Sequence, residues 1–206
     1  MATIYTIGHS TRLLDEFVAA IKAQDIRTLV DIRSFPMSRR MPHFNRETLE
    51  TQLWKHGIVY VWLKELGGRR KKVRNDSPNT GLRNDSFRNY ADYMLTVDFT
   101  QAVARLLQIA VGTADSVNRL RAGSRTGASG TPGITTEENS GGNTAIMCAE
   151  RVYLRCHRRL VSDYLTAHGH TVLHIDDEKH RPYPHTLTAE ARLVNECLVY
   201  DAQQLF

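Results

Sequence analysis

The stretch "ATIYTIGHSTRLLDEFVAAIKAQDIRTLVDI", residues 2–32, decides the fold that the sequence predicts. It opens with the apolar, β-branched run 2–7, which is typical of a buried strand and stops at Gly8. The segment 10–24 then repeats apolar side chains at helical spacing, and 27–32 is a second apolar run. The stretch therefore predicts a strand, a helix and a second strand.

The same alternation continues along the rest of the chain. Further strands are expected over 58–63, 144–148 and 170–175, and further helices over 44–57, 87–110, 154–169 and 186–206. Strands that alternate with helices at this spacing favour a parallel sheet with right-handed crossovers. We therefore expect one α/β domain over 1–206, in three layers, with a mainly parallel sheet of about five strands and helices on both faces.

Two long polar segments interrupt this pattern. The segment 64–86 is basic and rich in turn residues, and it is too long to be a minimal connection, which favours a functional role. The segment 111–143 is rich in Gly, Ser and Thr and has almost no apolar side chains. Such a composition predicts a flexible surface insertion.

The composition is that of a soluble globular protein, with 41% hydrophobic and 24% charged residues among 206. No apolar run approaches the roughly 20 residues needed to span a bilayer, and the first residues do not resemble a signal peptide. Three cysteines are too few for a secreted disulfide scaffold, which predicts a reduced, cytoplasmic protein. The net charge of +5 favours phosphate-bearing partners, nucleic acid among them, and an oligomer stays an open alternative.

Ionisable and small residues follow most of the predicted strands. Ligands of open parallel sheets bind outside the carboxyl ends of the strands, so these residues are expected to share one site. The candidates are His9 and Ser10 after the first strand, Asp31, Arg33, Arg39, Arg40 and Asn45 after the second, and Cys148, Glu150, Cys156, His157 and Arg158 after the fourth.

Four of these side chains are candidates for catalysis, and each also has a structural interpretation. Glu150 and Asp31 are candidate acid–base groups or nucleophiles of glycosyl transfer, or else carboxylates paired with arginines. His157 is a candidate general acid or anion ligand, or a histidine satisfied by a backbone carbonyl. Cys148 is a candidate thiolate nucleophile at a helix start, or a small buried hydrophobe.

The cysteine spacing argues against a metal. Zinc sites typically use cysteines in close pairs, whereas seven residues separate Cys148 from Cys156 and no second pair exists. His157 adjoins Cys156 and would point in a different direction on a helix. Zinc stays an alternative if His9 or His180 completes the set of ligands. We therefore assign no metal ligand, and the cofactor stays unassigned.

Several stretches, in order along nearly the whole chain, resemble the domain of unknown function 488 family. They are "YTIGHSTR", "LVDIRSFPMSRRMPHFN", "LKELGGRR", "FRNYADYM" and "CAERVYLRCHRRLVSDYL", the last followed by "HTVLHI". The resemblance implies a compact α/β domain and supports treating the motif residues as one assembled site. It implies no particular reaction.

Three hypotheses about function remain open. The first is an enzyme that acts on a phosphate-bearing substrate, a nucleotide or nucleic acid, which arginines 33, 39, 40 and 158 would hold. The second is a non-catalytic nucleic-acid-binding module that uses the basic loop 64–74 and the insertion. The third is a thiol or redox enzyme that uses Cys148 and Cys156.

Overall fold

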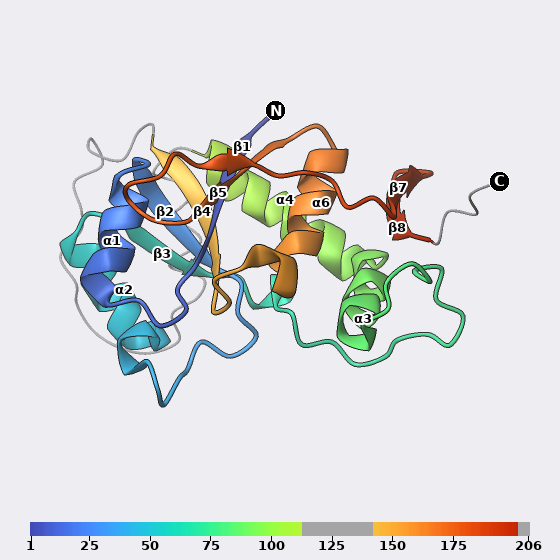
Figure 1. Ribbon diagram of the computed structural model, residues 1–206, viewed down its shortest axis with the longest axis horizontal. Coiled ribbons are helices and arrows are strands. Elements are labelled where there is room, and N and C mark those ends of the chain that lie inside the picture. Colours follow the sequence, from blue (N-terminus) through green and yellow to red (C-terminus); the bar gives the residue numbers. More distant parts are fainter. Residues whose placement is uncertain (113–141, 202–206) are drawn as a thin grey trace.

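The computed structural model describes residues 1–112 and 142–201, so the predicted insertion 111–143 lies almost wholly outside the described residues. In this part of the chain, a six-stranded sheet has the order β3-β2-β4-β1-β5-β6, and β7 and β8 form a separate pair (Figure 1). The strands are β1 (Thr3–Gly8), β2 (Ile26–Asp31), β3 (Val59–Trp62), β4 (Asn143–Cys148), β5 (Thr171–Ile175), β6 (Tyr183–Pro184), β7 (Ala191–Val194) and β8 (Cys197–Tyr200).

The strands β1 to β5 pair in parallel, and only β6 is antiparallel in the large sheet. The helices are α1 (Leu14–Lys22), α2 (Arg46–Lys55), α3 (Asp85–Met94), α4 (Val97–Val111) and α6 (Arg158–Ala167), with single 3-10 turns at Pro42–Phe44, Lys64–Leu66 and Tyr153–Arg155. The predicted α/β fold with a mainly parallel sheet is confirmed, and all five predicted strands are present. The short β6 was not predicted.

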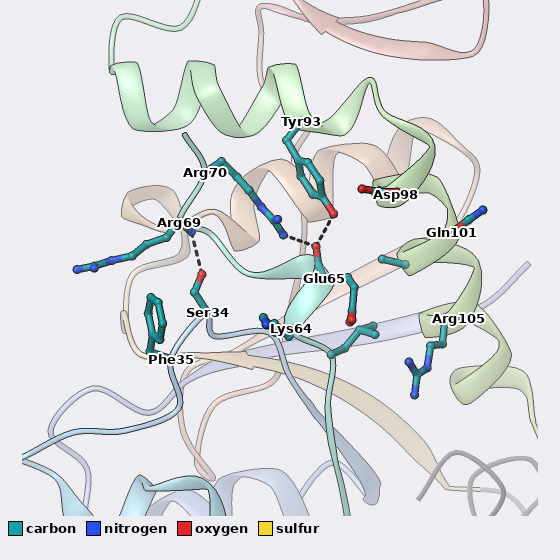
Figure 2. Close-up of a pocket in the computed structure, with 12 residues that line it drawn as sticks. Ser34, Phe35, Lys64, Glu65, Arg69, Arg70, Tyr93, Asp98, Gln101 and Arg105 are labelled. Carbon is teal, nitrogen blue, oxygen red and sulfur yellow. Dashed lines mark hydrogen bonds between the residues drawn. The ribbon is translucent and has the colours of Figure 1, made fainter. Parts of the chain in front are cut away.

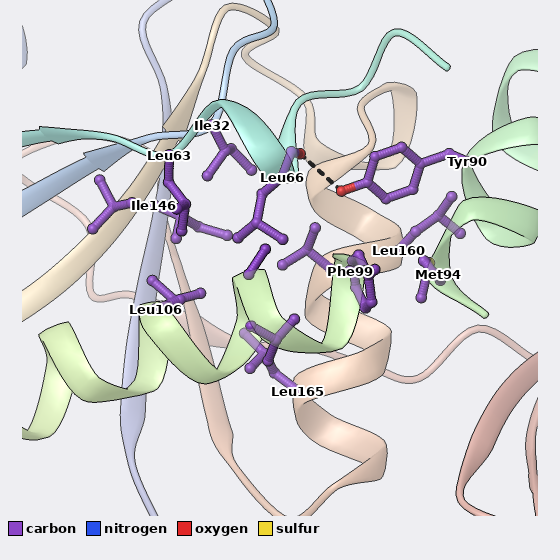
Figure 3. Packing of buried hydrophobic residues seen from close by; sticks show 14 of the residues in the cluster. Ile32, Leu63, Leu66, Tyr90, Met94, Phe99, Leu106, Ile146, Leu160 and Leu165 are labelled. Atoms are coloured by element: carbon purple, nitrogen blue, oxygen red, sulfur yellow. Dashed lines mark hydrogen bonds between the residues drawn. The ribbon is translucent and has the colours of Figure 1, made fainter. Parts of the chain in front are cut away.

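Consecutive strand residues pack into two separate hydrophobic clusters. Val30, Val61 and Ile146 lie in one cluster, whereas their neighbours Leu29 and Tyr60 lie in the other. The first cluster also contains the buried side chains of α3, α4 and α6 (Figure 3), and the second contains those of α1 and α2. Side chains of successive strand residues point to opposite faces, so each face of the sheet has its own apolar partners.

The predicted helix over 186–206 is wrong, because β7 and β8 form a hairpin there and residues 202–206 lie outside the described part. The turn residues Asn195 and Glu196 have φ of 49° and 63°. Two consecutive positive φ angles are typical of the turns that match the twist of a hairpin. The apolar spacing of this segment fits a helix and a strand equally, so periodicity alone does not separate them.

The predicted helix over 87–110 is two helices. It breaks after Met94, and the Thr96 side chain accepts a hydrogen bond from the backbone of Phe99 at the start of α4. In the described ranges, no single helix is long and apolar enough to cross a membrane, and only α3 and α4 together, bent by 78°, meet that requirement. The inward side chains of both helices belong to the hydrophobic core.

A buried chain of polar groups connects the helix α6 to the sheet. The Arg158 guanidinium donates to the Thr6 hydroxyl at 3.2 Å, and this hydroxyl lies 2.8 Å from Nδ1 of His174. Nε2 of His174 lies 3.0 Å from Nδ1 of His185, whose Nε2 lies 2.9 Å from the Asp163 carboxylate. When both imidazoles are neutral, all of these hydrogen bonds point the same way: each group donates to the next one, and the Asp163 carboxylate is the final acceptor.

Burial of His174 makes stability depend on pH. Burial lowers the pKa of His174 to about 3, with repulsion by His185 and Arg158 acting in the same direction, so the folded protein holds His174 neutral. In the unfolded chain, His174 has a pKa of about 6.5. The folded protein therefore has its full stability above that pH and loses stability as the pH falls towards 3, because the unfolded chain then binds a proton that the folded protein does not. We expect the free energy of unfolding in urea to fall between pH 7 and 5, by at most about 1.4 kcal/mol per pH unit for this histidine.

The variant His174→Gln is expected to have a shallower slope over the same range, because glutamine does not titrate. His56→Gln changes an exposed histidine after α2 and should leave the slope as it is in the unmodified protein. Equal slopes in His174→Gln and the unmodified protein would contradict the assigned neutral state.

Candidate active site

A cleft of about 940 Å³ lies at the carboxyl ends of β2 and β4. Its walls come from the segments that follow β2, β3 and β4 and from the first turn of α3. The lining residues are Arg33, Ser34, Phe35, Met37, Arg39, Gly68, Arg69, Ser86, Phe87, Cys148, Ala149, Glu150, Arg155, Cys156 and His157. This is the edge of the sheet at which the sequence predicts a site.

Parallel pairing aligns the ends of the strands. Gly8 at the end of β1 lies opposite Cys148 at the end of β4, and Asp31 at the end of β2 lies opposite Met147. Beyond the strands, the backbone of His9 donates to the Cys148 carbonyl at 3.0 Å. The chain after β1 therefore runs beside the chain after β4.

Two thiols and an imidazole meet at one point of the cleft. Nδ1 of His157 lies 3.8 Å from Sγ of Cys148 and 3.6 Å from Sγ of Cys156. On the other side of the ring, Nε2 lies 3.0 Å from the carbonyl oxygen of Ile32, to which it donates. This bond places the ring proton on Nε2 and leaves the Nδ1 lone pair directed at the sulfurs.

The electrostatics separate the two thiols. A hydrogen bond with the Cys156 sulfur, together with burial, raises the pKa of Cys148 above the ordinary thiol value. The same hydrogen bond lowers the pKa of Cys156, and the nearby Arg158 guanidinium acts in the same direction. Cys156 is thus the thiol that ionises first, and Cys148 is the donor that stabilises its thiolate.

The paired glycines of "LKELGGRR" let this cluster form. A Cβ at Gly68 would lie 2.4 Å from Nδ1 of His157, and a Cβ at Gly67 would lie 2.6 Å from Oγ of Ser34. Real Cβ atoms do not approach other atoms so closely, so any larger residue would push the His157 ring away from the sulfurs. The close approach of the backbone explains why glycine occupies both positions.

Arg158 holds the chain between β4 and α6 from inside the protein. It is 2% exposed, and its guanidinium donates to the carbonyl oxygens of Glu150 and Arg151, while its backbone NH donates to Sγ of Cys156. A Cβ at Gly8 would overlap the Glu150 carbonyl, at 1.8 Å. In the described part of the chain, no carboxylate lies within ion-pair distance of Arg158.

Asp31 and Arg33 form a closed structural pair. The Asp31 carboxylate is fully buried and accepts hydrogen bonds from Nε of Arg33 at 2.9 and 3.0 Å and from the Tyr60 hydroxyl at 2.7 Å. The Arg33 guanidinium also donates to the Phe44 carbonyl and to Nε2 of His9. These contacts agree with the structural interpretation of Asp31 as a carboxylate paired with arginine. Arg33 also lines the cleft, and its role in phosphate binding stays a prediction.

The other candidates divide between the cleft and its surroundings. Glu150, a candidate catalytic carboxylate, and Arg39, a candidate substrate-binding residue, are exposed and line the cleft. Arg40 is exposed but is not among the lining residues. Asn45 accepts a hydrogen bond from the backbone of Ser38 at 2.6 Å, and Ser10 has φ of 48° in the turn after β1.

His9 lies buried next to the cleft and is not one of its lining residues. It is 4% exposed and stacks on Phe44 with ring centroids 4.2 Å apart. Burial and the nearby Arg33 guanidinium lower the pKa of His9 to about 4, so the ring is neutral at pH 7. Its Nδ1 donates to the Ser10 carbonyl, which leaves Nε2 to accept from Arg33.

The sequence analysis missed Arg69 and Arg155 as wall residues of the cleft. Both are exposed, and the Arg69 guanidinium lies over the ring of Phe35, 5.6 Å from its centroid. A second hollow of about 500 Å³ adjoins the cleft at Ser34, Phe35 and Arg69 (Figure 2). The stretch "LKELGGRR" was the signal for Arg69, and no pattern separated Arg155 from its neighbours.

The comparisons with known proteins give one match. The family model of the domain of unknown function DUF488 matches residues 13–117, just over half of the chain. No curated protein and no solved structure gives a significant match. The match includes the segment after β2 and the paired glycines, and it ends before Cys148.

A pair of substitutions tests the structural role of Asp31. Asp31→Asn leaves the buried Arg33 charge without its partner, so we expect the free energy of unfolding to fall by about 3–5 kcal/mol. Asp25→Asn removes the same kind of pair from the exposed start of β2, where Arg27 lies 2.9 Å away, and should cost less than about 1 kcal/mol. Urea unfolding measures both, and an equal, small effect of the two substitutions would contradict the structural role.

Proposed function

Since the chain belongs to the DUF488 family, whose function is unknown, we propose a function from its cleft: an enzyme that acts on a phosphate-bearing substrate, a nucleotide or nucleic acid. The observation that carries the proposal is the composition of the cleft wall. Four arginines and a single carboxylate line it beside two thiols and an imidazole. A wall of this kind attracts an anion and places reactive side chains next to it.

Three of the four arginines are exposed and suited to hold phosphate. In the described part of the chain, no hydrogen bond or ion pair engages the side chains of Arg39 and Arg155, and the Arg69 guanidinium lies over the Phe35 ring. A guanidinium can donate two parallel hydrogen bonds to a phosphate group, which makes arginine the usual choice for such binding. Arg33 adds positive charge at the base of the cleft, although Asp31 largely neutralises it.

The aromatic side chains at the rim favour a nucleotide over a simple phosphate ester. Phe35 is 67% exposed, and Phe87 lines the same cleft. An exposed ring beside a cluster of arginines offers a stacking surface for a base whose phosphate the arginines hold. A free phosphate has no flat apolar surface with which to use these rings.

Glu150 is the proposed acid–base group. It is the one carboxylate among the described residues that line the cleft, and its side chain is exposed to the cleft solvent. Its backbone is held by Arg158, so the carboxylate is presented from an anchored position. A carboxylate facing a bound phosphate ester can accept a proton from an attacking water or donate one to a leaving group.

We place this activity in the cytoplasm, because the small, odd number of cysteines fits a reducing compartment.

A second candidate function is non-catalytic binding of nucleic acid. The observation that favours it is the basic segment after Gly68, where Lys71 and Lys72 are exposed next to the arginines of the cleft.

Thermal unfolding with a panel of nucleoside phosphates, inorganic phosphate and short DNA and RNA tests the proposal. A ligand that binds only the folded protein raises the melting temperature. We expect nucleoside phosphates to raise it, and Arg39→Ala and Arg155→Ala each to weaken binding by about tenfold, which corresponds to the loss of a charge-assisted contact. Arg27→Ala, at the opposite end of β2, should bind as the unmodified protein does.

The nucleotide that binds is then incubated with the protein and its products are separated by mass. Glu150→Gln should keep the affinity and lose product formation, because only its proton transfer is removed. The proposal fails if no mononucleotide binds and long nucleic acid binds with a steep salt dependence that Glu150→Gln and Arg155→Ala leave unchanged. That result would establish the binding module.

A further inference from the structure

We propose that Cys148, Cys156 and His157 bind a zinc ion whose fourth coordination position faces the cleft. This inference is independent of the proposed substrate. The sequence analysis assigned no metal, because the spacing of the cysteines is not that of a zinc motif. The structure brings together what the spacing separates: one ligand atom from each of the three residues lies within 4.8 Å of the others.

The separations fit tetrahedral zinc. Zinc binds thiolate sulfur at about 2.3 Å and imidazole nitrogen at about 2.0–2.1 Å, so two such ligands of one ion lie about 3.5 Å apart. The observed separations from Nδ1 of His157 to the two sulfurs are 3.6 and 3.8 Å. These two separations therefore need to change by only a few tenths of an ångström for zinc to bind, and the two sulfurs lie within 4.8 Å of each other.

The imidazole is already oriented as a ligand. Its Nε2 donates to the Ile32 carbonyl at 3.0 Å, which fixes the tautomer with an unprotonated Nδ1. Metal-binding histidines commonly donate their other NH to a carboxylate or a backbone carbonyl, which holds the ring in place. Gly68 lies against the same ring and keeps it facing the sulfurs.

The surroundings favour thiolates. Arg158 is buried, without a carboxylate partner in the described part of the chain, and its backbone NH lies 3.4 Å from Sγ of Cys156. Within the described ranges, the Nε of Arg158 has no hydrogen-bond partner. A buried cation of this kind is stabilised by negative charge nearby. The Arg158 cation therefore favours the thiolate form of the sulfurs, which is the form that binds zinc. The two thiol protons leave to solvent as the ion enters, so the net charge of the cluster does not change.

The three protein ligands leave one position of a tetrahedron open. All three residues line the cleft, so a bound ion would be reached from it. Zinc with three protein ligands and a water is the arrangement of catalytic sites, whereas structural sites have four protein ligands. The open position beside Glu150 and the arginines suits a water molecule or a phosphate oxygen.

Metal analysis of the full chain tests the inference. The protein is produced in zinc-supplemented medium, purified under reducing conditions and dialysed, and its zinc content is measured by mass spectrometry. We expect one zinc ion per chain, and its loss in Cys148→Ser and in Cys156→Ser. Cys197→Ser is the matched control, because this exposed cysteine in β8 lies outside the cluster, and the variant should keep the zinc.

Cobalt substitution keeps the test decisive if a variant fails to fold. The unmodified protein with Co²⁺ in place of zinc should show the charge-transfer absorption of a cobalt–thiolate bond. The inference is overturned if the folded, reduced protein takes up neither metal, or if Cys148→Ser and Cys156→Ser keep both. A mass loss of two hydrogens that locates a Cys148–Cys156 disulfide in freshly purified protein would also overturn it and favour a redox pair.

Discussion

The buried guanidinium of Arg158 is the interaction on which the rest of the site depends. It is the largest fully buried side chain of the described residues, and it donates to two carbonyl oxygens of the segment that leaves β4. A charge this deep is costly unless its donors are satisfied, so the segment is held against the end of β1. Gly8 permits this approach, because any side chain there would overlap the Glu150 carbonyl. The buried Arg158 guanidinium thus holds the short connection that contains Glu150, Cys156 and His157 on the side that faces the protein interior.

The positive charges at this edge of the sheet have different tasks. Arg33 is neutralised by Asp31 and joins β2 to the 3-10 turn at Pro42–Phe44 through the Phe44 carbonyl. Arg158 has no carboxylate partner among residues 1–112 and 142–201, and it lies near two sulfurs, where its positive charge favours the thiolate form. Arg39, Arg69 and Arg155 stand at the surface of the cleft. Of these arginines, only the three exposed ones are positioned to bind a ligand. Arg33 and Arg158 instead hold the backbone segments that form the wall of the cleft.

Sequence reasoning found the edge of the sheet but not the arrangement within it. The strand-end rule led to the segments that follow β2 and β4, which line one cleft, because parallel register is set by the apolar strands themselves. It could not show that Tyr60, on the neighbouring strand, donates a hydrogen bond to the buried Asp31 carboxylate. It also treated Cys156 and His157 as helical. Cys156 is extended, with φ of −128° and ψ of 148°, and α6 begins only at Arg158, so both side chains reach the same point. The hairpin of β7 and β8 was not predicted for a related reason. Its two turn residues with positive φ do not change the spacing of the apolar residues, which was the signal used to predict secondary structure.

We infer that the end of β4 and the connection to α6 hold two sulfurs and an imidazole around one ligand at the wall of the cleft. A crystal structure of the reduced, zinc-loaded protein, with diffraction recorded on both sides of the zinc absorption edge, would show whether they do. We expect an anomalous peak that is present only above the edge and lies within bonding distance of Sγ of Cys148, Sγ of Cys156 and Nδ1 of His157. A structure in which the His157 ring faces away from the sulfurs, or in which Cys148 and Cys156 are joined, would contradict it.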